Sequence, residues 1–100
     1  MKLKRGVNLA GIQPELVVAM IVCEGIISRY QEFTVTSILD GKHKTGSLHP
    51  KGLALDIRTR NFSGESALKN CIEDLRDALG PQFDVVRESD HIHVEFDPKP

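Results

Sequence analysis

Two short polar segments, far apart in the sequence, constrain the fold of this chain more than any other feature. The first contains His49 and Asp56, and the second spans residues 90–95 (DHIHVE) with His91 and His93. The imidazole and the carboxylate of the first segment, with one imidazole of the second, make the kind of three-ligand set that holds a catalytic zinc ion. The fourth coordination position of such an ion stays open. A fold that uses this set must bring both segments to one place.

The two cysteines, Cys23 and Cys71, lie outside both segments. Each occupies an apolar, helix-like register, where a free cysteine behaves as a small hydrophobe. We therefore expect two buried thiols without a disulfide. A cysteine-rich structural zinc site is not expected.

The composition is typical of one globular domain. The chain has 100 residues, of which 40% are hydrophobic and 27% are charged, and this length suffices for one modest core. We therefore predict one domain over residues 1–100. The net charge of −1 gives no electrostatic reason to expect a nucleic acid or a membrane as partner.

A basic start followed by an apolar run, residues 16–23, raises the question of a secretory signal. Asn8, Gln13, Pro14 and Glu15 interrupt the region before the run, and no small-residue cleavage site follows it. The run is also much shorter than the roughly 20 residues that cross a bilayer. We expect a buried helix, and synthesis in the cytoplasm without a signal peptide.

Hydrophobic periodicity predicts two helices. Pro14 suits the first turn of a helix that runs to about Tyr30. This helix is apolar almost all round, so we expect it to be largely buried. The second helix is amphipathic, with Ser63 as the expected N-cap and Gly80-Pro81 as its end.

Alternating or β-branched residues predict four strands, and a polar loop separates the first two. The predicted strands cover residues 33–39, 53–58, 83–87 and 91–96, and the loop covers residues 42–47. The order helix, strand, strand, helix, strand, strand indicates an α+β domain with a small, mostly antiparallel sheet.

The predicted strands bring the polar residues together. On the last strand, His91 and His93 alternate with apolar residues and therefore share one face of the sheet. Asp56 can reach that face from a neighbouring strand. Burial of such a cluster is costly without a partner, which a divalent cation would supply. A hydrogen-bonded polar cluster or a solvated sheet face is the alternative.

The first segment has the pattern S-x-H-x-x-G-x-A-x-D, formed by Ser47, His49, Gly52, Ala54 and Asp56, and an H-x-H strand follows. This combination resembles the zinc D-alanyl-D-alanine carboxypeptidase family, whose fold is shared with the hedgehog signalling domain and with phage cell-wall endopeptidases. The resemblance covers nearly the whole expected sheet and implies a hedgehog/DD-peptidase-like fold with two main helices. Gly52 and Ala54 are expected to be small so that the loop and strand pack closely.

Carried over residue by residue, the resemblance makes His49, Asp56 and His93 the ligands of one zinc ion per chain. The choice of His93 over His91 rests on related forms in which an apolar residue and an acid follow H-x-H, here Val94-Glu95. Cobalt, nickel or manganese can also bind such ligands. The implied chemistry is metal-assisted hydrolysis, in which zinc acidifies the attacking water and polarises a peptide carbonyl while a carboxylate takes the proton.

Related enzymes place a general base or acid shortly before the last ligand. Asp90 is the favoured candidate here, and Glu88 is the alternative. His91 is expected to stabilise the developing oxyanion, to assist proton transfer or to hydrogen-bond a ligand.

Ser47, Lys42 and Arg58 are the candidate substrate-binding residues. Ser47 would hydrogen-bond a ligand or the substrate, or else stabilise the turn before the metal ligand. Arg58 and Arg60 could bind a substrate carboxylate or simply be solvated. Many relatives carry an arginine after the preceding strand, where this chain offers only Lys42 as a point charge. Endopeptidase and carboxypeptidase action therefore both stay open.

The expected function is that of a zinc metallopeptidase that hydrolyses D-amino-acid-containing stem or cross-link peptides of bacterial peptidoglycan. The resemblance favours a phage or prophage enzyme that acts at the cell wall, as an endolysin or on the virion. The main alternative is a non-catalytic metal-binding virion or interaction module on the same fold. A metal-dependent nuclease is a more distant possibility, since no basic patch with interleaved aromatics is present in the sequence.

Overall fold

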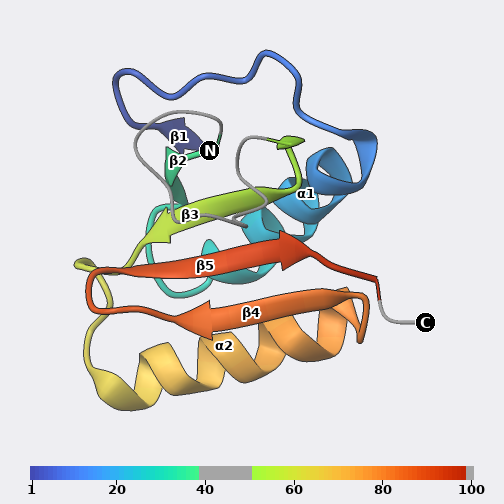
Figure 1. The fold of residues 1–100 in the computed structure, drawn as a ribbon. Helices are drawn as coiled ribbons and strands as arrows, with labels where there is room; N and C mark the ends of the chain where they lie inside the picture. Colours follow the sequence, from blue (N-terminus) through green and yellow to red (C-terminus); the bar gives the residue numbers. More distant parts are fainter. Residues whose placement is uncertain (39–50, 99–100) are drawn as a thin grey trace.

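The computed structural model describes residues 1–38 and 51–98, which have an α+β architecture of two helices and a mixed five-stranded sheet (Figure 1). The strand order in the sheet is β1-β2-β3-β5-β4. The strands are β1 (Lys2–Leu3), β2 (Thr34–Ser37), β3 (Ala54–Arg58), β4 (Phe83–Arg87) and β5 (His91–Phe96), and the helices are α1 (Pro14–Ile27) and α2 (Glu65–Leu79).

The sheet is mixed because β1 runs parallel to β2, whereas the pairs β2–β3, β3–β5 and β4–β5 are antiparallel. The prediction of a mostly antiparallel sheet omitted β1 and its parallel pairing. Lys2 and Leu3 are both exposed, so no alternation of buried and exposed positions marks this strand in the sequence. Backbone hydrogen bonds from the N–H groups of Lys2 and Lys4 to the carbonyls of Phe33 and Val35 hold it in place.

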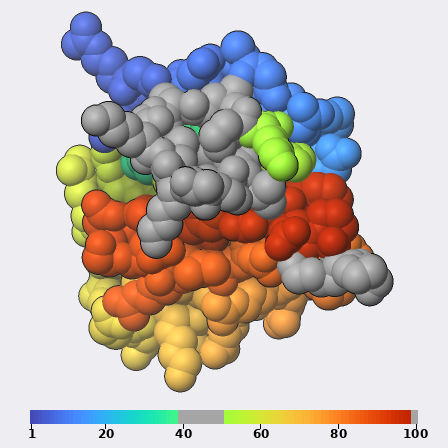
Figure 2. All heavy atoms as spheres, in the orientation of Figure 1, coloured from blue at the N-terminus to red at the C-terminus, as the bar shows by residue number. Residues whose placement is uncertain are grey.

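Both helices contribute to the hydrophobic core on one face of the sheet. Leu55 and Ile57 of β3 and Ile92 and Val94 of β5 are fully buried against them. Side chains alternate along a strand, so the residues between these positions point to the other face. Among the described residues, neither helix covers that second face. Figure 2 shows β5 in red and β4 in orange as neighbouring strips on the surface.

Helix α1 departs from its prediction in two ways. It ends at Ile27 rather than near Tyr30, and it is not largely buried. Val17, Val18 and Ile21 are 41%, 60% and 65% exposed. The helix packs against the core by one side only, so its apolar character all round does not produce burial all round.

Helix α2 begins one residue later than predicted, because its N-cap is Gly64 rather than Ser63. Gly64 makes no side-chain cap hydrogen bond. The helix ends at Gly80 as expected, where the backbone has φ +82°. Arg76 in its last turn donates two hydrogen bonds, of 3.2 and 2.7 Å, to the carbonyl of Val85 on β4. β4 is an edge of the sheet, so this arginine covers part of an open strand edge.

Both cysteines are free and buried, as the sequence indicates. Burial raises the pKa of the Cys23 thiol to about 12 and that of Cys71 to about 11. Neither thiol is therefore ionised at neutral pH, and both act as core residues.

In the described part of the chain, no helix has the length and apolar character needed to cross a membrane.

Candidate functional site

The pairing of β3 with β5 brings the two polar segments together. Asp56 lies opposite His93, and Arg58 lies opposite His91. Since the flanking positions face the core, these polar side chains share the face that the helices do not cover. The shared face predicted from the alternation of residues is thus confirmed for Asp56, His91 and His93.

The His93 ring lies between two carboxylates. Its Nδ1 is 2.9 Å from Oδ1 of Asp56, and its Nε2 is 2.7 Å from Oε1 of Glu95. The three side chains are 17%, 15% and 22% exposed, in the order His93, Asp56 and Glu95. Partial burial strengthens such charge-assisted hydrogen bonds, so the orientation of this ring is well defined.

His91 extends the network toward solvent. Its Nε2 is 3.6 Å from Oδ1 of Asp56, and its Nδ1 is 2.7 Å from Oδ1 of Asp90. The Asp90 side chain is 86% exposed, whereas that of His91 is 29% exposed. A continuous chain of ionisable groups therefore runs from the surface at Asp90 through His91 and Asp56 to His93.

These contacts shift the pKa values of His93 and Asp90. The hydrogen bond to Asp56 raises the pKa of His93, with a further contribution from Glu95, while partial burial opposes the shift. The hydrogen bond from His91 lowers the pKa of Asp90. Asp90 is therefore ionised at neutral pH, which is the state in which a carboxylate can accept a proton.

Two of the three predicted metal ligands are adjacent. Oδ1 of Asp56 and Nδ1 of His93 lie 2.9 Å apart on this sheet face, and an imidazole nitrogen with a carboxylate oxygen is a donor pair that suits zinc. The donor types of these two residues match those that the predicted zinc site would use. The third predicted ligand, His49, lies outside the described residues, as do Ser47 and Lys42.

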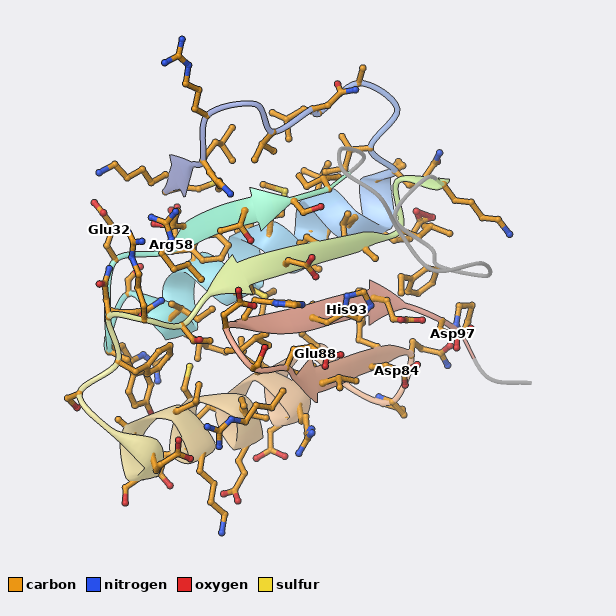
Figure 3. All side chains as sticks on the ribbon, turned by 60° about the vertical axis from the view of Figure 1, so that its left-hand side comes forward. Glu32, Arg58, Asp84, Glu88, His93 and Asp97 are labelled. Carbon is orange, nitrogen blue, oxygen red and sulfur yellow. The ribbon has the colours of Figure 1, made fainter. Side chains whose placement is uncertain are left out.

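Glu88 lies between β4 and β5, where its backbone N–H donates a 2.9 Å hydrogen bond to the carbonyl of His91. Its side chain is exposed, and among the described residues it makes no hydrogen bond to the network. Of the two candidate bases, Asp90 is thus the one that the described structure joins to His91. Figure 3 labels Glu88 and His93.

A basic cavity adjoins the exposed end of this network. It has a volume of about 410 Å³ and is lined by Lys4, Thr36, Arg58, Arg60, Asp90 and His91. Lys4 comes from the segment after β1, whereas Arg58 ends β3 and Arg60 follows it, so only the folded chain brings the three cations together. The cavity offers positive charge beside Asp90 and His91.

Glu95 and Lys4 belong to this site although the sequence did not predict either as a site residue. Alternation along β5 could have identified Glu95, since it shares a face with His93. No sequence signal could have identified Lys4, because its place at the cavity depends on the unpredicted strand β1.

Glu95 also belongs to an acidic group at the other end of the same sheet face. One carboxylate oxygen from each of Asp84, Glu95 and Asp97 lies within 4.8 Å of the others. In Figure 3, Asp84 and Asp97 lie toward one end of β5 and Arg58 toward the other, with His93 between them. Exposed acidic groups commonly gather without an ion, and a set of carboxylates alone is no evidence for zinc.

Gly52, just before β3, is confirmed as a position where a small residue permits close packing. It is buried and has φ +72°. A Cβ atom at this position would lie 2.2 Å from the backbone oxygen of Gly11. The N–H of Gln13 donates a 3.0 Å hydrogen bond to the Gly52 carbonyl. The segment before α1 is thereby attached to the segment that leads into the Asp56 strand.

Comparison of the chain with protein-family models, with curated proteins and with solved structures gives no significant match.

Proposed function

We propose that this chain is a zinc metallopeptidase with a hedgehog/DD-peptidase-like fold that hydrolyses peptide bonds of bacterial peptidoglycan. The observation that carries the proposal is the convergence of Asp56 and His93 across β3 and β5, next to the hydrogen-bonded pair Asp90–His91. The S-x-H-x-x-G-x-A-x-D pattern supplies His49 as the third ligand. Asp56 and His93 supply two donor atoms on one sheet face, and Asp90 supplies a proton acceptor beside His91.

In this proposal, His49, Asp56 and His93 would hold one zinc ion. When bound, zinc would lower the pKa of the attacking water and polarise the peptide carbonyl. Asp90 accepts the proton of the water and returns it to the leaving amine. His91, held between Asp90 and Asp56, orients the Asp90 carboxylate and keeps it ionised before the attack.

The basic cavity supports a substrate that carries a carboxylate close to the cleaved bond. Lys4, Arg58 and Arg60 form no ion pair with any residue that the structure describes, so no described acid neutralises their charges. Stem peptides of peptidoglycan end in a carboxylate, and arginine binds carboxylates with matching geometry. Both carboxypeptidase action and endopeptidase action near a free carboxylate are compatible with this surface.

The biological setting comes from the sequence resemblance. We propose that the enzyme is encoded by a phage or prophage and acts on the cell wall, either as an endolysin or on the virion. In that setting the partner is the peptide part of peptidoglycan.

The test is to incubate the zinc-loaded protein with purified peptidoglycan and to identify new termini by mass spectrometry. We expect new amino termini with the wild type and a large loss of product with Asp90→Asn. Glu73→Gln is the matched control, since Glu73 is an exposed acid on α2, away from the network. The absence of new termini after incubation with the wild type would rule out the proposed peptidase activity. Zinc binding without cleavage would instead support the non-catalytic metal-binding module.

A further inference from the structure

The contact between His93 and Glu95 has no role in the proposed proton transfer, yet it is one of the shortest side-chain contacts on this sheet face. Oε1 of Glu95 lies 2.7 Å from Nε2 of His93, on the side of the ring that faces away from Asp56. The two side chains are 22% and 17% exposed. The ring is therefore held at both nitrogens.

We propose that Glu95 is a positioning residue, which holds the Nε2 side of His93 so that Nδ1 faces Asp56 and is the nitrogen presented to zinc. The proposal rests on the proposed function, since it assigns Glu95 a role in the same metal site. Glu95 would not contact the metal, the substrate or the reacting water. It would act through His93 alone.

The backbone makes this arrangement rigid. His93 and Glu95 are two residues apart on β5, so their side chains point to the same face. β5 lies inside the sheet, with β3 on one side and β4 on the other. Its register fixes His93 opposite Asp56 on β3 and opposite Val86 on β4. Hydrogen bonding along both edges of the strand therefore sets the position of Glu95 relative to the ring.

The chemistry of imidazole explains why the orientation matters. A neutral ring carries one N–H group and one lone pair, and a metal binds only the nitrogen with the lone pair. Since Nε2–H donates to Glu95, Nδ1 is the nitrogen that would give up its proton to bind zinc through the lone pair, next to Asp56. Metal-ligating histidines usually donate their other N–H to a carboxylate or carbonyl, which fixes the ring and makes it a better ligand. Loss of that partner typically weakens metal binding about 10–100-fold.

The acidic neighbours of Glu95 provide a competing explanation that can be separated by mutation. Asp84 and Asp97 lie close to Glu95, so Glu95 could act only as one negative charge among three. In that case removal of Asp97 would weaken metal binding as much as removal of Glu95. If Glu95 acts through its hydrogen bond to His93, the two substitutions will differ.

The experiment measures zinc affinity by competition with a chromophoric chelator, for wild type, Glu95→Ala, Glu95→Gln and Asp97→Asn. We expect about 10–100-fold weaker binding for Glu95→Ala and close to wild-type binding for Asp97→Asn. Glu95→Gln should lie between them, because its amide oxygen still accepts the N–H but carries no charge. Gln is also close in shape to Glu, so this variant keeps the test valid if Glu95→Ala does not fold.

A second readout reports the ring directly. Nitrogen NMR of His93 in the zinc-loaded protein should show Nε2–H and a metal-bound Nδ1 in the wild type, and a mixed or exchanging ring in Glu95→Ala. Unchanged zinc affinity and an unchanged ring signal in Glu95→Ala would overturn the role of Glu95 while leaving the peptidase proposal intact. A wild type that binds no zinc would overturn both. A wild type that binds zinc without cleaving peptidoglycan would overturn only the peptidase activity.

Discussion

Replacement of Gly52 by alanine is the most direct test of how the segment before β3 is held. The new Cβ atom would lie 2.2 Å from the oxygen and 3.0 Å from the carbon of the Gly11 carbonyl. These are backbone atoms, which cannot move away as the end of a flexible side chain can. The backbone at Gly52 also has φ +72°, which an alanine rarely adopts.

The expected cost has three parts. The left-handed backbone costs alanine roughly 1–2 kcal/mol. Overpacking in a close contact adds about 1–3 kcal/mol. The hydrogen bond from Gln13 to the Gly52 carbonyl contributes about 1 kcal/mol and is weakened if the segments separate. Because the segments relieve part of the contact by separating, we take about 3 kcal/mol as the central value, which corresponds to a fall in Tm of roughly 12–24 °C for a domain of this size.

Thermal and urea unfolding, followed by circular dichroism, measure this effect. Gly6→Ala is the matched control, because Gly6 has φ +95° but no atom within 4 Å of the place that a Cβ would occupy. It therefore carries the backbone cost without the contact. We expect Gly52→Ala to be clearly the less stable variant. Equal loss of stability in the two variants would refute the proposed packing of Gly52 against Gly11.

Three further predictions concern pH, substrate and helix stability. In metal-free protein, the raised pKa of His93 stabilises the fold fully below the unfolded value of about 6.5, and this contribution is lost as pH rises through the folded pKa. The free energy of unfolding in urea should therefore fall more between pH 6 and pH 9 for the wild type than for His93→Gln. An equal fall in the two proteins would contradict this prediction. Arg58→Ala should raise KM roughly tenfold for a peptide with a free carboxylate, because one charged hydrogen bond is lost. The KM for the same peptide with its carboxylate converted to an amide should not change. An equal change in KM for both peptides would exclude carboxylate binding in the cavity. Gly25→Ala, inside α1 with no atom within 4 Å of the added Cβ, should stabilise the protein by about 0.5–1 kcal/mol in urea unfolding, and destabilisation would show that this turn of the helix needs glycine.

The strands next to the site could be predicted from the sequence because their signals are local. β4 and β5 have the predicted bounds, and β3 begins one residue later than predicted. Alternation of polar and apolar residues also identifies the face shared by Asp56, His91 and His93. Gly80 marks the end of α2, because glycine readily adopts the positive φ found there.

The remaining features depend on contacts between distant parts of the chain. β1 exists only because its backbone pairs with β2, and its two exposed residues carry no periodic signal. The exposure of Val18 and Ile21 depends on which side of α1 meets the core, which an apolar helix does not specify. Lys4 joins Arg58 at the cavity only through the position of β1. Sequence patterns thus identify the faces of elements, whereas the register and order of the strands determine which faces meet.

The contact between Arg76 and the Val85 carbonyl has a consequence for the behaviour of the protein at high concentration. An edge strand offers free backbone groups, and a strand from another molecule can pair with them to start a growing aggregate. The Arg76 guanidinium donates both of its hydrogen bonds to the acceptor that such a strand would need, and it adds a positive charge that a second copy of the same edge would repel. One side chain of α2 thereby protects β4 from intermolecular sheet extension.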